Sequence, residues 1–169
     1  MLVLGALGGS AAASPGSDFR KDHETAAKAW AYAEKTWPNQ YAGVWGVDNE
    51  KTGFDDFVFA FTARPGAKVA ELRQKFPTKI ASYVPARRTY SKRYLDGLLS
   101  QMITDRSRIL HGRLKPPGKA PGRFDLGMDM SRNKVNLYKP FFAPGYKRWF
   151  KHRYGQAILF VKSGLAQWE

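Results

Sequence analysis

Four acidic residues lie close together in the sequence and are the first candidates for catalysis. They are Asp48, Glu50, Asp55 and Asp56. Neighbouring carboxylates can act as general acid and base, or bind Ca²⁺. Asn49 and Gly53 lie among them, and Asp, Asn and Gly together are typical of a turn between strands. We therefore predict a hairpin turn here and keep an enzyme of unfamiliar type as the alternative.

Other residues that carry out catalysis or bind metals are few. The chain has no cysteine, so it has no disulfide, thiolate metal site or cysteine nucleophile. Its histidines, His23, His111 and His152, have no second ligand at metal-binding spacing. The glycine motifs of nucleophile elbows, P-loops and dinucleotide-binding folds do not occur. The sequence predicts a non-catalytic protein without metal or cofactor.

Lysine and arginine are concentrated in the second half of the chain. The formal net charge is +14; residues 1–84 have 10 basic and 9 acidic residues, whereas residues 85–169 have 18 and 5. This excess is larger than solubility requires and predicts a basic face for an anionic partner, with a merely solvated surface as the alternative. The candidate binding residues for that partner are Arg87, Arg88, Lys92, Arg93, Arg113, Lys115, Lys119, Arg123, Lys147, Arg148, Lys151 and Arg153.

Aromatic residues alternate with these cations around residues 83–94 and 146–154. Such a mixture can bind single-stranded nucleic acid or a glycan, because the rings stack while the cations pair with anionic groups. The second segment follows helical spacing, which instead indicates that its rings face the core. Both interpretations stay open from the sequence.

The elements that must hold these residues alternate between helices and strands. Apolar spacing, prolines and turn residues predict helices over 22–36, 68–76 and 145–154, and a further helix after Ser91. They predict strands over 41–47, 57–62, 80–84 and 157–161, and a hairpin of two strands over 124–138. The order α-ββ-αβ-α-ββ-αβ contains two ββαβ-like blocks without an obvious residue-level repeat. It predicts an α+β fold with a mostly antiparallel sheet and helices on one face. We expect a single domain over 18–164, an exposed basic loop over 111–123 and a tail over 165–169.

The first 17 residues have the character of a leader. Met1–Gly8 is apolar, and Ala11 and Ala13 form the small-residue pattern of a signal-peptide cleavage site. No Lys or Arg precedes Arg20, and a start codon further upstream would supply the missing positive charge. We predict a signal-peptide-like leader and disordered linker over 1–17, and a secreted or cell-surface protein; an Ala- and Gly-rich tail is the alternative. No apolar run approaches the roughly 18 residues of a membrane span.

Five segments share motifs with one known family. They are 41–48 (YAGVWGVD), 57–62 (FVFAFT), 68–76 (KVAELRQKF), the hairpin over 124–138 with its motif GMDMSRNKV, and 154–158 (YGQAI). These motifs resemble those in the pro-regions of secreted bacterial serine proteases of the alpha-lytic and streptogrisin type and in related exported small domains of actinobacteria. The resemblance extends over about residues 38–164. The sequence departs from the family in having no protease domain after Glu169 and a long, basic loop over 112–123.

The resemblance implies a function. Pro-regions of this type assist the folding of their protease and inhibit it tightly; they pack a sheet against it and place their C-terminal tail in its active-site cleft. Carried over to this chain, the contact with a protease would be made by the neighbouring sheet edge and by Ser163, Gly164, Leu165, Ala166, Gln167, Trp168 and Glu169. An extended tail suits recognition of this kind.

Three functions are therefore compared. The first is an exported, non-catalytic binding domain, a pro-region-like protease inhibitor or folding helper whose partner is a secreted protein such as a serine protease. The second is a basic binder of an anionic polymer, whether cell-wall polymer, acidic glycan or nucleic acid. The third is the enzyme that the acidic cluster would serve. We favour the first.

Overall fold

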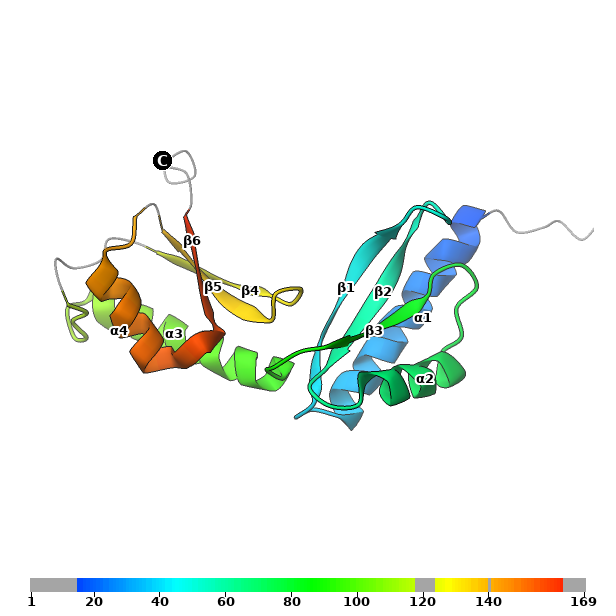
Figure 1. Cartoon of the computed structure of the whole chain (residues 1–169), viewed down its shortest axis with the longest axis horizontal. Coiled ribbons are helices and arrows are strands. Elements are labelled where there is room, and N and C mark those ends of the chain that lie inside the picture. The colour runs from blue at the N-terminus through cyan, green and yellow to red at the C-terminus, as the bar shows by residue number, and fades with distance from the viewer. Residues whose placement is uncertain (1–14, 118–123, 140, 163–169) are drawn as a thin grey trace, which may run out of the picture.

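The computed structural model of the chain describes residues 15–117, 124–139 and 141–162. They form two lobes that lie side by side (Figure 1). The first lobe, residues 15–87, contains α1 (Pro15–Thr36), β1 (Tyr41–Asn49), β2 (Phe54–Phe61), α2 (Pro65–Lys75) and β3 (Tyr83–Arg87). The second lobe, residues 92–162, contains α3 (Lys92–Leu110), β4 (Asp125–Asp129), β5 (Lys134–Lys139), α4 (Pro144–Tyr154), the 3₁₀ turn η1 (Gly155–Ala157) and β6 (Ile158–Lys162). The predicted α+β class and element order are confirmed.

The two lobes share one topology. In each, two strands form an antiparallel hairpin and a third strand joins in parallel, giving the strand orders β1-β2-β3 and β4-β5-β6. A parallel strand requires a crossover connection, which α2 and α4 provide. The two ββαβ-like blocks of the sequence thus become two three-stranded sheets, where we expected one sheet.

Helices α1 and α2 cover one face of the first sheet (Figure 1). Phe57, Phe59 and Phe61 alternate along β2 and are buried in the core beneath these helices. From α1, Ala29 and Ala33 enter the same core and are fully buried. Large residues on the strand and small residues on the helix let the helix lie close to the sheet, and burying each phenylalanine contributes about 1.5–3 kcal/mol.

Helices α3 and α4 cover one face of the second sheet in the same way (Figure 1). Here Val135 and Leu137 of β5 pack with Leu95 and Met102 of α3 and with Phe150 of α4, all nearly inaccessible to solvent. The helices supply the bulk that the strand supplies in the first lobe. The large core residues lie mainly on the strand in the first lobe and mainly on the helices in the second. The two lobes therefore share a topology without sharing a residue pattern.

The boundaries of two elements differ from the prediction. Helix α1 begins at Pro15, so residues 15–17 belong to the fold and not to a linker; Asp18 in the first turn stabilises that end of the helix. Strand β3 lies at Tyr83–Arg87 and passes through Pro85, which we expected to end the strand. Proline is accommodated because β3 is an edge strand, where one row of backbone N–H groups has no strand partner.

Helix α3 begins where the sequence indicates. The Oγ of Ser91 accepts a hydrogen bond from the backbone N of Tyr94 at 3.2 Å and caps the helix. Tyr94 and Ile103, which the apolar spacing places on the buried face, are about half exposed.

Three predicted features lie outside the described residues. They are most of the leader, residues 118–123 of the basic loop, and the predicted tail over 165–169, since residues 163–169 are not described. Residues 111–117 of the loop are described and form neither helix nor strand. Within the described ranges, no helix is both long enough and apolar enough to cross a membrane.

Candidate functional site

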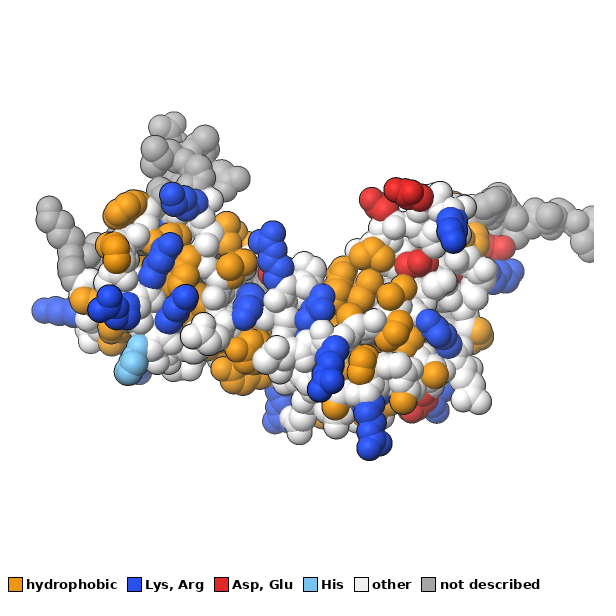
Figure 2. Space-filling view, in the orientation of Figure 1, with side chains coloured by type: hydrophobic (Ala, Val, Ile, Leu, Met, Phe, Trp, Pro, Cys, Tyr) orange, Lys and Arg blue, Asp and Glu red, His pale blue; other side chains and the backbone are white. Residues whose placement is uncertain are grey.

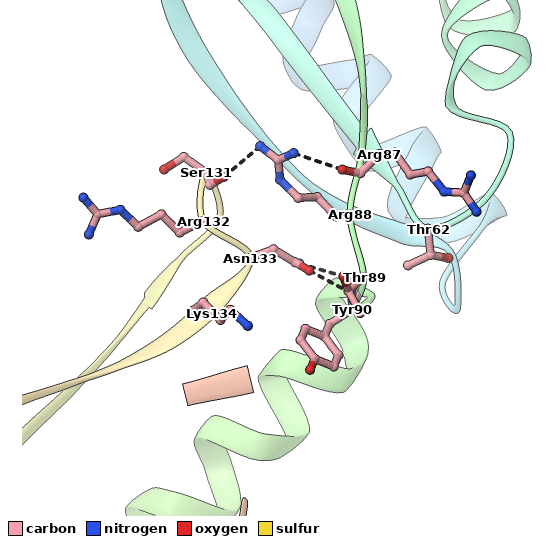
Figure 3. Close-up of a pocket in the computed structure, with 9 residues that line it drawn as sticks. All are labelled: Thr62, Arg87, Arg88, Thr89, Tyr90, Ser131, Arg132, Asn133 and Lys134. Atoms are coloured by element: carbon pink, nitrogen blue, oxygen red, sulfur yellow. Dashed lines mark hydrogen bonds between the residues drawn. The ribbon is translucent and has the colours of Figure 1, made fainter. Parts of the chain in front are cut away.

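An open pocket of about 810 Å³ lies where the two lobes meet. Its walls come from the end of β3, from the connection between the lobes and from the turn between β4 and β5 (Figure 3). The lining residues are Thr62, Arg87, Arg88, Thr89, Tyr90, Ser131, Arg132, Asn133 and Lys134. Four of these carry a positive charge and none carries a carboxylate. Figure 2 shows Lys and Arg side chains on the surface of both lobes and near the place where the lobes meet.

Asn133 fixes the two walls of the pocket to each other. Its Oδ1 accepts a hydrogen bond from the backbone N of Tyr90 at 2.7 Å, and its Nδ2 donates one to the backbone O of Tyr90 at 2.8 Å. The side chain is buried, and the backbone is left-handed with φ 55°. Asn tolerates that conformation better than most residues. These two hydrogen bonds, which we call the Asn133 clasp, hold the turn of the second sheet against the connection between the lobes.

Arg88 makes a second link across the pocket (Figure 3). Its Nη1 donates to the backbone O of Arg87 at 2.9 Å, and its Nη2 donates to the backbone O of Ser131 at 2.7 Å. The guanidinium lies 4.8 Å from the ring centre of Trp45, within cation–π distance. Two carbonyls and a ring position this charge. None of the three groups carries a formal negative charge that would neutralise it.

Lys134 and Arg132 supply charge from the second lobe. The Nζ of Lys134 donates to the backbone O of Gln156 at 2.6 Å and lies 5.2 Å from the ring centre of Tyr90. Arg132 is exposed and pairs loosely with Asp129, at 3.7 Å. Burial favours a higher pKa for Asp129, but hydrogen bonds from the Arg132 backbone N and the Ser131 Oγ outweigh it and lower the pKa. This carboxylate thus stays ionised and is engaged by its own turn.

The other predicted cations divide into two groups. Lys92 and Arg153 belong to ion pairs within the fold: Lys92 contacts Glu34 at 3.0 Å and Asp96 at 2.8 Å, and Arg153 contacts the buried Asp105 at 2.7 Å. The exposed group is Arg93, Arg113, Lys115, Lys147, Arg148 and Lys151. Lys119 and Arg123 lie outside the described residues. Of the ten predicted cations that the structure describes, only Arg87 and Arg88 line the pocket between the lobes.

The network at Asp105 holds α3 to the end of α4. Its Oδ2 accepts hydrogen bonds from the Nε of Arg153 and from the hydroxyl of Tyr154, both at 2.8 Å. Burial by itself favours a higher pKa for Asp105, but hydrogen bonds from Arg153 and Tyr154 and the positive charges of Arg153 and Arg108 lower it. In the same helix the Tyr146 ring is buried in the core. Helical spacing thus gave the correct interpretation of these rings.

The acidic cluster lies at the far end of the β1–β2 hairpin. Asp48 and Asp55 are paired across the two strands. Asp56 accepts hydrogen bonds from the Nδ2 of Asn49 at 2.9 Å and from the backbone N of Ser82 at 2.7 Å, so it joins the hairpin to the segment before β3. Among the described residues, no group of three or more His, Cys, Asp or Glu side chains is arranged to hold a metal ion.

Strand β6 forms an edge of the second sheet. It pairs with β5 on one side, and no described strand pairs with its other side. Ile158 is buried, the next three residues are half-buried and Lys162 is exposed. The chain continues from this strand directly into residues 163–169. A strand edge and the predicted tail are therefore contiguous.

Arg132 and Lys134 are the pocket residues that sequence reasoning missed. They belong to a segment that we interpreted only as a hairpin turn, more than 40 positions from Arg87 and Arg88. Their positive charge was the one available signal. Comparison with known proteins adds no further guide, because no family model matches the chain and no curated protein matches its sequence.

Proposed function

We propose that this chain is an exported, non-catalytic binding domain that recognises a secreted protein in the manner of a protease pro-region, as an inhibitor or a folding helper. The observation that carries the proposal is the edge of β6, which has no strand partner in the described chain and leads into the tail. The sequence motifs shared with protease pro-regions support the same role.

An unpaired edge can bind an extended segment of another protein. Its backbone N–H and C=O groups hydrogen bond to the incoming strand, while alternate side chains give specificity. Natural proteins usually protect such edges against unintended pairing, and the charge of Lys162 at the end of β6 serves this purpose. We expect the partner to extend the second sheet by one strand, with residues 163–169 occupying its substrate cleft.

The test is inhibition of secreted serine proteases of the chymotrypsin fold from the same source. The full chain and a chain that lacks residues 163–169 are compared by the hydrolysis of a peptide substrate. We expect at least tenfold weaker inhibition after the deletion, with unchanged folding by circular dichroism. Equal inhibition by the two chains, or none by either, contradicts the proposal. The variant Arg148→Ala with Lys151→Ala, exposed on α4, is the control and should inhibit normally.

A second candidate function is the binding of an anionic polymer. It is favoured by Lys147, Arg148 and Lys151 of α4 and by Arg113 and Lys115, which are exposed and for which the described structure gives no ion pair. Binding through such residues releases counterions, so the affinity should fall steeply as salt increases. Replacing Arg113, Lys115, Lys119 and Arg123 by Ala should lower the affinity for a teichoic acid, an acidic glycan or a single-stranded nucleic acid. Salt-independent binding argues against this function.

A further inference from the structure

The pocket between the lobes combines features that suit an anion smaller than a polymer. It is concave, it is lined by four cations and by the hydroxyls of Thr62, Thr89 and Ser131, and it receives residues from both lobes. We infer that this pocket binds one tetrahedral oxyanion, a phosphate or sulfate group, and that the bound group links the two lobes. The inference depends on neither proposed function, since a free anion is sufficient for it.

Arg88 is the fixed donor of the site. A guanidinium has five N–H groups, and two of those of Arg88 are used by the carbonyls of Arg87 and Ser131. Its Nε is buried and has no hydrogen-bond partner in the described structure. A buried donor without a hydrogen-bond partner is unfavourable, because it has lost its bond to water and gained none in return. Three N–H groups, one of them buried and unsatisfied, are therefore left for a ligand.

The exposed arginines complete the site from opposite sides. Figure 3 shows Arg87 and Arg132 extending away from each other, with the Arg88 guanidinium between them. No described hydrogen bond or ion pair holds the Arg87 side chain, and the ion pair of Arg132 with Asp129 is long at 3.7 Å. Both side chains can turn toward a bound oxyanion. Arginine suits this role because its planar fork matches phosphate oxygens.

Electrostatics favour occupation of the pocket. The four cations that line the pocket repel one another. The carboxylate closest in sequence to the lining residues, Asp129, is engaged by the Ser131 hydroxyl and the Arg132 backbone N. A divalent oxyanion removes part of the repulsion between cations of the two lobes, so it should stabilise their arrangement.

The experiment is a calorimetric titration of the full chain with inorganic phosphate and, separately, with sulfate, at constant ionic strength set by sodium chloride. We expect saturable binding at one site, and a melting temperature that rises with ligand, because a ligand that binds only the folded state stabilises it. The variant Arg87→Ala with Arg132→Ala should bind at least tenfold more weakly. Both residues are exposed, and circular dichroism and the ligand-free melting temperature verify that the variant folds.

The matched control removes the same charge elsewhere. Arg148→Ala with Lys151→Ala alters two exposed cations of α4 and should keep the affinity within twofold. An equal loss in this control shows that only diffuse charge acts, and overturns the inference. Absence of saturable binding to the unmodified chain also overturns it.

A second arm identifies the source of the oxyanion. A short phosphodiester oligomer is titrated in place of inorganic phosphate. Equal affinity per phosphate group means that the pocket takes a single free group. Binding more than tenfold tighter, lost again in the Arg87→Ala, Arg132→Ala variant, means that the pocket takes a phosphate carried on a chain. Both results support an oxyanion site and differ only in the ligand.

Discussion

Asn133 holds the backbone of Tyr90 by two hydrogen bonds: its Oδ1 accepts one from the Tyr90 N at 2.7 Å, and its Nδ2 donates one to the Tyr90 O at 2.8 Å. Tyr90 belongs to the connection between the lobes, and Asn133 to the turn of the β4–β5 hairpin. One buried amide therefore satisfies two polar groups of a segment that belongs to neither sheet. This clasp positions the turn that bears Arg132 and Lys134 against β3, and so it forms the pocket.

Replacing Asn133 tests the clasp. In Asn133→Ala, the N and O of Tyr90 both lose a buried partner, and alanine is strained at a φ of 55°. We expect the free energy of unfolding to fall by about 2–4 kcal/mol. Asn133→Gly loses the same hydrogen bonds without the strain, so its free energy of unfolding should be about 1 kcal/mol higher than that of the alanine variant. Urea denaturation measures both, and a loss below 0.5 kcal/mol in the alanine variant, roughly the scale of a surface substitution, contradicts this role.

Gly43 provides a second test of the contact between the lobes. It lies in β1 with a φ of 126°, and a Cβ there would meet the Met130 Sδ at 2.8 Å. Gly43→Ala should therefore displace the β4–β5 turn and strain β1, lowering the free energy of unfolding by about 1–3 kcal/mol. Adding Met130→Ala removes the contact with Sδ, but it leaves the Cβ of residue 130 at 3.2 Å and the strain of β1. Gly43→Ala should therefore lower the free energy of unfolding by less in the Met130→Ala background than in the unmodified chain. Equal losses in the two backgrounds would exclude the contact.

The fold could be predicted from the sequence wherever one local pattern determines the structure. The apolar alternation of residues 57–61 and the Ser91 cap each depend on neighbours within a few positions, and both agree with the structure. The division into two sheets could not be predicted, because it depends on which hairpin each parallel strand joins. Pro85 misled the prediction of β3 because an edge strand tolerates a proline that a central strand excludes.

The candidate site was predictable in part. The sequence identified Arg87 and Arg88 by their charge, but it also identified Lys92 and Arg153. These two form ion pairs within the fold, Lys92 with Glu34 and Asp96, and Arg153 with Asp105. Sequence spacing cannot distinguish a cation that faces a carboxylate from one that faces a pocket. The distinction arises only when the β4–β5 turn meets the connection between the lobes, a contact of residues more than 40 positions apart.

Lys92 should stabilise the fold below alkaline pH. It joins α3 to Glu34 of α1, and also contacts Asp96. Partial burial lowers the pKa of Lys92, but the hydrogen bonds and charges of Asp96 and Glu34 outweigh this and raise it. A raised folded-state pKa gives stability that is present below the unfolded pKa, about 10.4, and is lost as the pH rises through the folded value. Lys92→Met should cost about 0.5–1 kcal/mol at pH 8, since the carboxylates are half exposed, and less at pH 11. Urea denaturation at both pH values measures this, and a pH-independent difference argues against the ion pairs.

Asp105 should account for part of the loss of stability in acid. Its carboxylate is buried and accepts hydrogen bonds from Arg153 and Tyr154, and its pKa is lowered in the folded protein. A lowered folded-state pKa gives stability that is present above the unfolded pKa, about 3.9, and is lost as the pH falls through the folded value. Asp105→Asn keeps the shape but not the charge, and leaves the Arg153 guanidinium, one-third exposed, without its partner. We expect a loss of about 2–3 kcal/mol at pH 7, below the range for a fully buried pair.

Because the variant cannot titrate at this position, its stability should fall less steeply than that of the unmodified chain between pH 4 and pH 2, values that bracket the unfolded pKa of about 3.9. Asp125→Asn, at an exposed ion pair with Arg106, is the control and should follow the unmodified chain closely; equal acid slopes for Asp105→Asn and the unmodified chain contradict the assignment.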